Sequence, residues 1–261
     1  MFAIITIQRE RMQTQCQVEK GQAVQGLADK TLHHGDSQSL TLEAVSSRMP
    51  ARKAATAAES GPMKKSKYKA DIAGGSLKLQ ESRIVAGLLL DEVSAEEWRY
   101  AIEDKNVLQK RSPGTAMRQA SLLRARLQTM GPGLWQIVQE GSKEAATHAL
   151  FAAAIKHSAI LAAFLDRVVR EQFRTFKHDL PRKLWLEFVE HLRNEDEAMP
   201  VWNDATTNKL GDSIFQILKE VGFITDTKTY RLQPVQMSSE VLAYLRDHDE
   251  RYVIERMQVA L

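Results

Sequence analysis

The stretch TTNKLGDSIFQILKEVGFI, residues 206–224, restricts the possible fold more than any other part of the chain. Its apolar residues recur at the spacing of one buried helix face, and they are Leu210, Ile214, Ile217, Leu218 and Val221. Asp204 precedes this stripe as a candidate N-terminal cap, and Gly222 follows it where left-handed backbone angles are needed. Two short β-prone runs, FIT and YRL, come next and are separated by DTKT. We therefore predict a helix that leads into a small hairpin, as in a winged helix.

Caps and a second apolar stripe predict further helices upstream. Ser94 and Glu97 have the spacing of a capping box, and Ser142 is a candidate cap for an alanine-rich helix. A Pro-Gly pair precedes a helix that is predicted to start at about Thr115. The buried face of that helix is predicted to comprise Ala116, Ala120, Leu123, Leu127 and Met130. These signals favour an all-α, mostly helical protein.

Residues 1–62 differ from the remainder of the chain. They contain Gln-rich and Ala/Ser-rich stretches and no sustained helical stripe. Met63 is then followed by four lysines within six residues, as at the beginning of many bacterial proteins. We expect residues 1–62 to be a disordered extension or an upstream start assigned in error. A helical bundle is predicted over residues 63–195, and a winged-helix-like module over residues 196–261.

No catalytic or cofactor motif is found in the sequence. The P-loop, the Gly-rich dinucleotide fingerprint, the zincin histidine pair and the nucleophile elbow are all missing. His148 and His157 lie in an alanine-rich helical region, where a packed histidine is commoner than a metal ligand. Asp166 and Glu171 flank Arg170 at a spacing typical of local salt bridges. We therefore expect a protein that is not an enzyme and has no cofactor and no metal.

The sequence favours a cytoplasmic location. Cys16 is the only cysteine and cannot form an internal disulfide, which fits a reducing compartment. The most apolar window, residues 149–169, is interrupted by Lys156 and His157, so we interpret it as a buried helix or helix pair instead of a membrane span. The N-terminus has no basic residue before its short apolar run and does not resemble a signal peptide.

Positive charge is concentrated in the first half of the predicted folded region. Residues 63–131 contain 13 Lys and Arg against 8 Asp and Glu, whereas residues 132–261 contain 16 against 19. A basic half favours a polyanionic partner, although a solvated charged face gives the same pattern. The candidate phosphate contacts are Lys64, Lys65, Lys67, Lys69, Arg83, Lys105, Lys110, Arg111, Arg118, Arg124 and Arg126. On a helical wheel, Arg124 and Arg126 flank the apolar stripe and Arg118 points away from it, so we expect all three to face outward.

The predicted winged-helix-like module adds a second set of candidate contacts. Asn208 and Lys209 lie near the start of the predicted helix, and Lys228 lies at the hairpin tip. In a winged helix, these positions approach the major groove and the phosphate backbone. Four neighbouring acids weaken the case because they repel phosphates, and they are Asp204, Asp212, Glu220 and Asp226.

Several segments, taken in order, resemble the BrxA family, the small helical component of bacteriophage-exclusion (BREX) defence systems. They are ESRIVAGLLL, AIEDKNVLQKRSPGTAMRQASLLRARL, FLDRVVREQF, LPRKLWLEFV and WNDATTNKLGDSIFQILKEVGFI. The similarity covers residues 67–261. It implies a cytoplasmic, non-enzymatic, all-helical protein with a fold similar to that of the RNA-binding factor NusB. It also implies binding to double-stranded DNA, but it supplies no contact residues.

The residues and the resemblance together predict an accessory DNA-binding protein of a BREX phage-defence system. It would contact duplex phosphates through the basic elements of residues 63–126. The alternatives are a protein–protein scaffold within the defence complex, with little direct nucleic-acid contact, and an RNA-binding factor. Other BREX components, namely a methyltransferase and an ATPase, are candidate partners, and a monomer is our working assumption.

Overall fold

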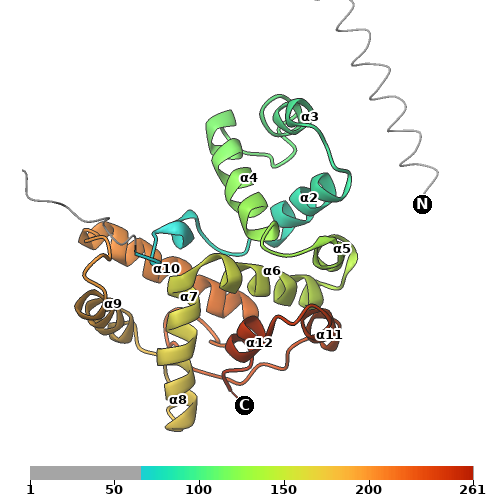
Figure 1. Cartoon of the computed structure of the whole chain (residues 1–261). Coiled ribbons are helices and arrows are strands. Elements are labelled where there is room, and N and C mark those ends of the chain that lie inside the picture. The colour runs from blue at the N-terminus through green and yellow to red at the C-terminus, as the bar shows by residue number, and fades with distance from the viewer. Residues whose placement is uncertain (1–65, 261) are drawn as a thin grey trace, which may run out of the picture. The chain divides into compact units, whose positions relative to one another are not determined.

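The computed structural model describes residues 66–260, and this part of the chain is mostly helical (Figure 1). The elements are, in chain order, η1 (Asp71–Gly74), α2 (Leu79–Leu90), α3 (Ala95–Arg99), η2 (Tyr100–Asp104), α4 (Pro113–Leu127), α5 (Pro132–Glu140), α6 (Lys143–His157), α7 (Ala159–Phe164), η3 (Leu165–Val169), α8 (Arg170–Arg174), α9 (Lys183–Glu195), α10 (Asp204–Val221), α11 (Ser239–Asp247) and α12 (Arg251–Met257). Of these, η1 is a 3₁₀ turn, and η2 and η3 are π-helical. The described residues form no extended strand, which confirms the all-α prediction. The expectations for residues 1–62 lie outside the described part of the chain.

Side-chain caps begin several of these helices as the sequence predicts. The Ser94 hydroxyl accepts the Glu97 backbone N–H at 3.2 Å, and the Glu97 carboxylate accepts the Ser94 N–H at 2.8 Å. Ser142 accepts the Ala145 N–H at 3.0 Å and so caps α6. Each cap satisfies backbone donors that have no partner within the helix.

Two predicted helix starts are wrong by one or two residues. Helix α4 begins at Pro113 and not near Thr115, because Ser112 caps it and proline suits the first helical position. Helix α10 is capped by Asn203, whose side chain accepts a backbone N–H of the first turn at 2.8 Å. Asp204 is instead the first helical residue.

Helix α10 and the segment after it follow the predicted pattern. All five residues of the predicted stripe are buried, and Gly222 ends the helix with φ 101°. The two short runs then pair through a single antiparallel bridge between Ile224 and Leu232, and the Thr225 N–H donates to the Arg231 carbonyl at 3.0 Å. They are too short to form regular strands. The likeness to a winged helix therefore stays a prediction.

Helix α6 crosses the middle of the described region, and α4, α5, α10, α11 and α12 pack around it (Figure 1). Most of its length is buried, and its many alanines allow close approach of these neighbours. One continuous hydrophobic cluster extends from Tyr68 to Val259. Residues on both sides of position 195 thus share a core, and the predicted division there stays a prediction.

The apolar window of residues 149–169 is a pair of helices separated by a sharp bend, as expected. Within the described residues, no single helix is long and apolar enough to cross a bilayer, whereas the pair Lys143–His157 and Ala159–Arg174, bent by 100°, meets that criterion together.

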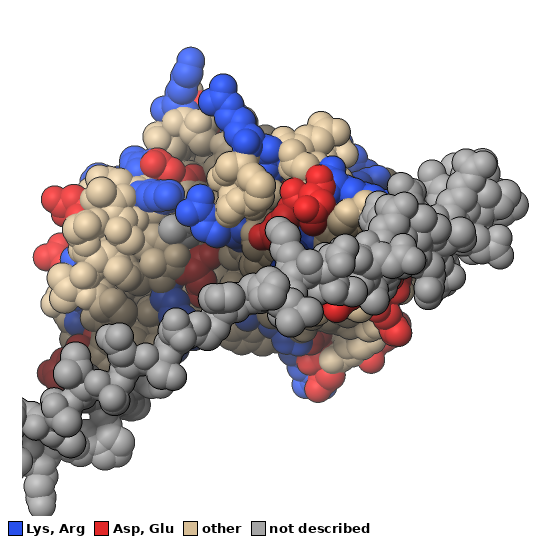
Figure 2. Space-filling view, turned by 90° about the horizontal axis from the view of Figure 1, so that it is seen from above, with Lys and Arg blue, Asp and Glu red and all other residues tan. Residues whose placement is uncertain are grey.

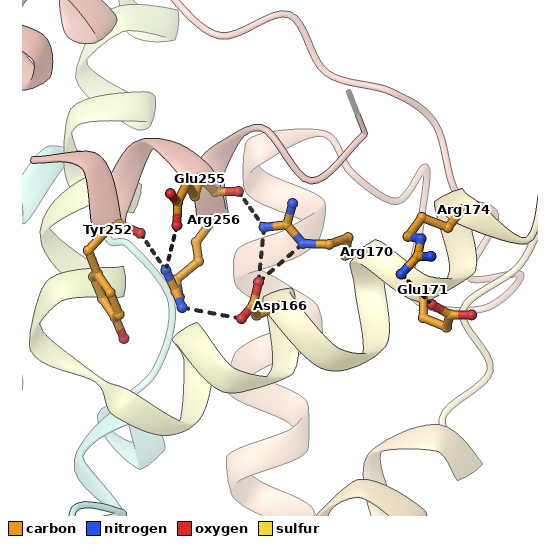
Figure 3. A network of polar contacts seen from close by, with 7 residues as sticks. All are labelled: Asp166, Arg170, Glu171, Arg174, Tyr252, Glu255 and Arg256. Atoms are coloured by element: carbon orange, nitrogen blue, oxygen red, sulfur yellow. Dashed lines mark hydrogen bonds and ion pairs between the residues drawn. The ribbon is translucent and has the colours of Figure 1, made fainter.

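The carboxylate of Asp166 links the C-terminal helix to η3 and α8 (Figure 3). Arg170 lies 3.0 Å from one oxygen of Asp166, and Arg256 donates to the other at 3.2 Å. Arg170 also donates to the Glu255 carbonyl at 2.7 Å, and Glu171 pairs separately with Arg174 at 3.6 Å. Both acids that flank Arg170 therefore have arginine partners, as the sequence predicts.

Candidate nucleic-acid interface

The N-terminal end of α4 is open to solvent and carries positive potential. Residues 112–115 are all exposed, and the first turn contains no acidic residue. Arg111 precedes the helix, and Arg118 lies one turn beyond Thr115, to whose hydroxyl it donates at 3.4 Å. A Cβ added at Gly114 would meet no atom within 4 Å. Pro113 has no backbone N–H, and the Thr115 and Ala116 N–H groups are bonded to Ser112, so the two arginines supply most of the attraction for an anion here.

The segment α3–η2 contributes further exposed cations. The side chain of Arg99 is 76 % exposed and lies 4.0 Å from Glu103. The Lys105 ammonium lies 5.0 Å from the centre of the exposed Tyr100 ring. Sequence reasoning missed Arg99, although its place next to Trp98 on a capped helix was a usable signal. Single π-helical turns such as η2 occur frequently at functional sites.

Arg124 connects the two elements. Its guanidinium lies 4.6 Å from the ring centre of Trp98, so α4 and α3 are joined by a cation–π contact. Trp98 is itself buried in the core, which fixes the position of the arginine. We call the resulting surface the α3–α4 face and define it by Arg99, Lys105, Arg111, Arg118 and Arg124.

Figure 2 views the molecule from the side on which α3 and α4 lie. Several Lys and Arg side chains project into solvent there, with Asp and Glu side chains among them. The acids on α3 and η2 are Glu96, Glu97, Glu103 and Asp104. The net positive charge of the face is therefore small. It suits weak, sequence-independent phosphate contacts better than tight binding.

Two predicted contacts are engaged within the fold. Lys110 forms a half-buried ion pair with Glu81 at 2.6 Å, which ties the segment before α4 to α2. Burial raises the pKa of Glu81, but the hydrogen bond from Lys110 outweighs burial and holds that pKa below its usual value. Arg83 donates to the carbonyl of Gly141 at 2.7 Å. Neither side chain belongs to the α3–α4 face.

The predicted outward orientation of Arg126 is wrong. The residue is only 3 % exposed, and its guanidinium donates to the backbone carbonyls of Ser76 at 3.0 Å and Gly75 at 3.2 Å. Burial lowers the pKa of Arg126 to about 10, and the charges of Asp71 and Glu220 oppose that shift. These carbonyls lie in the partly buried loop between η1 and α2, and the guanidinium supplies their donors. Arg126 is therefore a structural residue.

The lysine-rich segment is only partly described, since Lys64 and Lys65 lie outside the described residues. Lys67 and Lys69 are exposed, whereas Tyr68 between them is buried in the core. Ser66 donates to the Asp196 carboxylate at 2.8 Å. The described part of this segment is thus packed against the fold with its lysines directed outward.

The contacts predicted on α10 and the hairpin stay a prediction, and the surroundings of α10 make it a poor groove-reading helix. Asn208 and Lys209 are exposed, but most of α10 is buried in the core. Arg182 donates to the carbonyl of Asn208 at 3.0 Å and pairs with Asp212. Lys228 is exposed at the hairpin tip. A helix in this environment is poorly placed to enter a major groove.

The carboxylate of Asp226 fixes the hairpin turn. It accepts the backbone N–H groups of Lys228 at 2.6 Å and Thr229 at 2.7 Å, together with the Thr229 hydroxyl at 2.7 Å. Hydrogen bonds from Thr229 and Lys228 lower the pKa of Asp226 to about 2. A pKa this low keeps the carboxylate ionised at neutral pH, so the repulsion of phosphates expected from the sequence remains.

His148, one of the two histidines considered for chemistry, has a structural partner. Burial lowers the pKa of His148, and its Nδ1 accepts the Ser238 N–H at 3.0 Å. No group of three or more His, Cys, Asp or Glu within residues 66–260 is arranged to hold a metal ion. The surface hollow between η3–α8 and α9, of about 260 Å³, is wide open.

The fold and this surface define a small all-helical protein that presents charged faces to solvent. The chain belongs to the BrxA family of BREX phage-defence proteins, because the BrxA family model matches residues 66–249. BREX protein BrxA of Paramagnetospirillum magneticum is 61 % identical over 199 residues, which is 76 % of this chain and 100 % of that protein. BREX protein BrxA of Escherichia coli O9:H4 is 34 % identical over 67 % of this chain and 83 % of its own length.

A solved structure agrees with the fold. The crystal structure of an uncharacterized protein from Magnetospirillum magneticum is similar with a TM-score of 0.70 and 59 % sequence identity. The similarity covers 74 % of this chain and 100 % of that one.

Proposed function

We propose that this BrxA protein is a non-enzymatic, cytoplasmic accessory factor that binds duplex DNA through its α3–α4 face. The observation that carries the proposal is the open N-terminus of α4, which has Arg111 and Arg118 beside it and no acid in its first turn. Arg99 and Lys105 add two exposed cations on the adjoining α3–η2 segment, which also carries four acids. Such a surface suits phosphate oxygens, whose positions do not depend on base sequence.

The mode of binding follows from the chemistry of these groups. Each phosphate that a lysine or arginine neutralises releases condensed counterions. The plot of the logarithm of the binding constant against the logarithm of salt concentration therefore has a slope of about −0.9 per contact. Five cations on the face would give a slope of up to about −4 or −5. The acids on α3 and η2 reduce the attraction, so we expect weak affinity that is lost at high salt.

A triple alanine variant of Lys105, Arg111 and Arg118 tests the proposal. Fluorescence anisotropy with a labelled blunt duplex should show weaker binding by the variant at low salt and a shallower salt slope. The matched control removes the same charge from other elements, through alanine at Lys143, Lys219 and Arg246, which are also exposed. Equal loss in both variants would mean that only net charge matters, and the α3–α4 face would be rejected.

A scaffold that docks other BREX components is the second candidate function. The exposed apolar side chains of Leu186 and Val201 favour it, because such groups are common at protein interfaces. Pull-down of partner proteins from nuclease-treated extracts distinguishes the scaffold function from the DNA-binding function. If the triple alanine variant still recovers the partner proteins, the result supports the scaffold function alone. Competition between duplex RNA and duplex DNA tests the RNA-binding alternative. The proposed NusB-like fold is the reason for considering that alternative.

A further inference from the structure

Phe176 has an unusual backbone conformation at the end of α8. Its φ is 54°, in the left-handed region that favours glycine. The Phe176 N–H donates to the Phe173 carbonyl at 3.1 Å, and the Lys177 N–H donates to the Gln172 carbonyl at 2.9 Å. This pair of hydrogen bonds is the Schellman motif, whose left-handed position is usually occupied by glycine. Phenylalanine is strained at this position.

The two hydrogen bonds that end α8 compensate for part of that strain, but the side chain of Phe176 adds nothing to that compensation. The Phe176 residue is 86 % exposed, so burial of the ring does not stabilise the conformation. Tyr230 has the same φ of 54°, but its ring packs on Phe215 with the ring centres 5.1 Å apart. Phe176 is one of seven non-glycine residues with positive φ among the described residues, and its left-handed angle serves to end α8, which does not require a large exposed aromatic ring. The ring of Phe176 is therefore a candidate contact to another molecule.

The segment around Phe176 lies beside the hairpin. The Leu232 N–H donates to the His178 carbonyl at 2.8 Å, and the Leu180 N–H donates to the Tyr230 carbonyl at 2.9 Å. The loop between α8 and α9 and the hairpin thus form one surface, which we call the hairpin face. In Figure 1, the end of α8 points away from the N-terminus of α4, so this face is separate from the α3–α4 face.

The hairpin face is more strongly basic than the α3–α4 face. Its exposed cations are Arg174, Lys177, Lys183, Lys228 and Arg231. Its acids are Asp179, which is exposed, Asp226, which stays ionised within the turn, and Glu171, which pairs with Arg174. Arg174 is paired with Glu171 at 3.6 Å (Figure 3), but its side chain is 74 % exposed and such pairs are weak. Arg182 is not counted because it pairs with Asp212.

We propose that the hairpin face binds a nucleic-acid strand with an unpaired base, whose phosphates contact these cations and whose base stacks on Phe176. An exposed aromatic ring among exposed cations is the arrangement by which proteins hold single strands, and it is tolerant of sequence. The inference rests on the proposed DNA-binding function and adds a preference for ends, flaps or melted DNA over intact duplex. Binding of the same ring to an apolar pocket of a protein partner is the competing outcome.

The test compares a blunt duplex with the same duplex carrying a single-stranded overhang, using anisotropy and the full chain. The wild-type protein should bind the overhang duplex more tightly than the blunt one. Phe176→Gly should weaken binding of the overhang duplex about 10-fold and leave binding of the blunt duplex unchanged. Phe176→Trp is the matched control and should retain the preference, since tryptophan also stacks.

Thermal melting separates this role from a structural one. Glycine relieves the left-handed strain, so Phe176→Gly should raise Tm by about 2–4 °C while it weakens overhang binding. A lower Tm, or unchanged binding of both substrates, would overturn the proposal. Loss of a captured protein partner with unchanged DNA binding would also overturn it. The Lys105/Arg111/Arg118 variant should still prefer the overhang, so the two proposals can fail separately.

Discussion

Replacement of Arg126 by alanine should destabilise the fold more than it affects DNA binding. The substitution leaves the Ser76 and Gly75 carbonyls without their donor and removes the cation that faces Asp71 and Glu220. Each hydrogen bond to a charged group contributes about 1.5–3 kcal/mol, and breaking a buried charged network costs about 3–5 kcal/mol. We therefore expect a loss of about 4 kcal/mol. For the roughly 200 residues that the structure describes, the entropy of unfolding at Tm is about 0.4 kcal/mol per degree, so Tm should fall by about 10 °C.

Differential scanning fluorimetry and DNA anisotropy at low temperature measure the two effects. Arg118→Ala is the matched control: the residue is exposed, so its Tm should stay within about 1–2 °C of wild type while its DNA affinity falls. Arg126→Met should lose less stability than Arg126→Ala, because methionine fills more of the space left by the arginine side chain. An Arg126→Ala protein with unchanged Tm and weakened DNA binding would refute the assignment of Arg126 as a structural residue.

Three further predictions concern the fold. Burial lowers the pKa of His148 below 6.5. The stability that its neutral form provides is therefore present above pH 6.5 and is lost as the pH falls below that value. The Tm of the wild-type protein should drop between pH 7 and pH 5, and the Tm of His148→Gln should drop less. A Cβ at Gly211 would lie 2.7 Å from the Trp185 ring, so Gly211→Ala should cost about 1–3 kcal/mol in urea unfolding, whereas Gly114→Ala should change stability by about 0.5 kcal/mol or less. Asp226→Ala should speed hydrogen exchange of the turn amides without shifting the global Tm. In the wild-type protein, the protection of these amides should persist down to about pH 3, because the pKa of Asp226 is about 2.

The helices were predictable because their signals are local. The capping box at Ser94 and the stripe of α10 depend on spacings within a few residues, and the structure confirms both. The exact first residues of α4 and α10 were not predicted, since Asn203 and Asp204 are equally good caps by residue type. Local preference alone cannot choose between neighbouring caps.

The candidate site was less predictable because it depends on contacts between distant segments. Arg126 faces a loop about 50 residues earlier in the chain, and no helical wheel includes that loop. Lys110 and Glu81 meet across a separation of 29 residues. The hairpin face also requires pairing of His178 with Leu232, so its charge cluster is not visible in a linear charge count. The sequence identified the basic half of the protein, but not which cations are free to act.

The most direct test of the central claim is the salt dependence of duplex DNA binding by the full chain and its Lys105/Arg111/Arg118 triple alanine variant. We expect the plot of log Kd against log salt to be linear for both proteins. The slope of the variant should be smaller in magnitude by about 2–3, because up to three phosphate contacts are lost. Parallel plots with equal affinity would show that the α3–α4 face does not contact DNA phosphates.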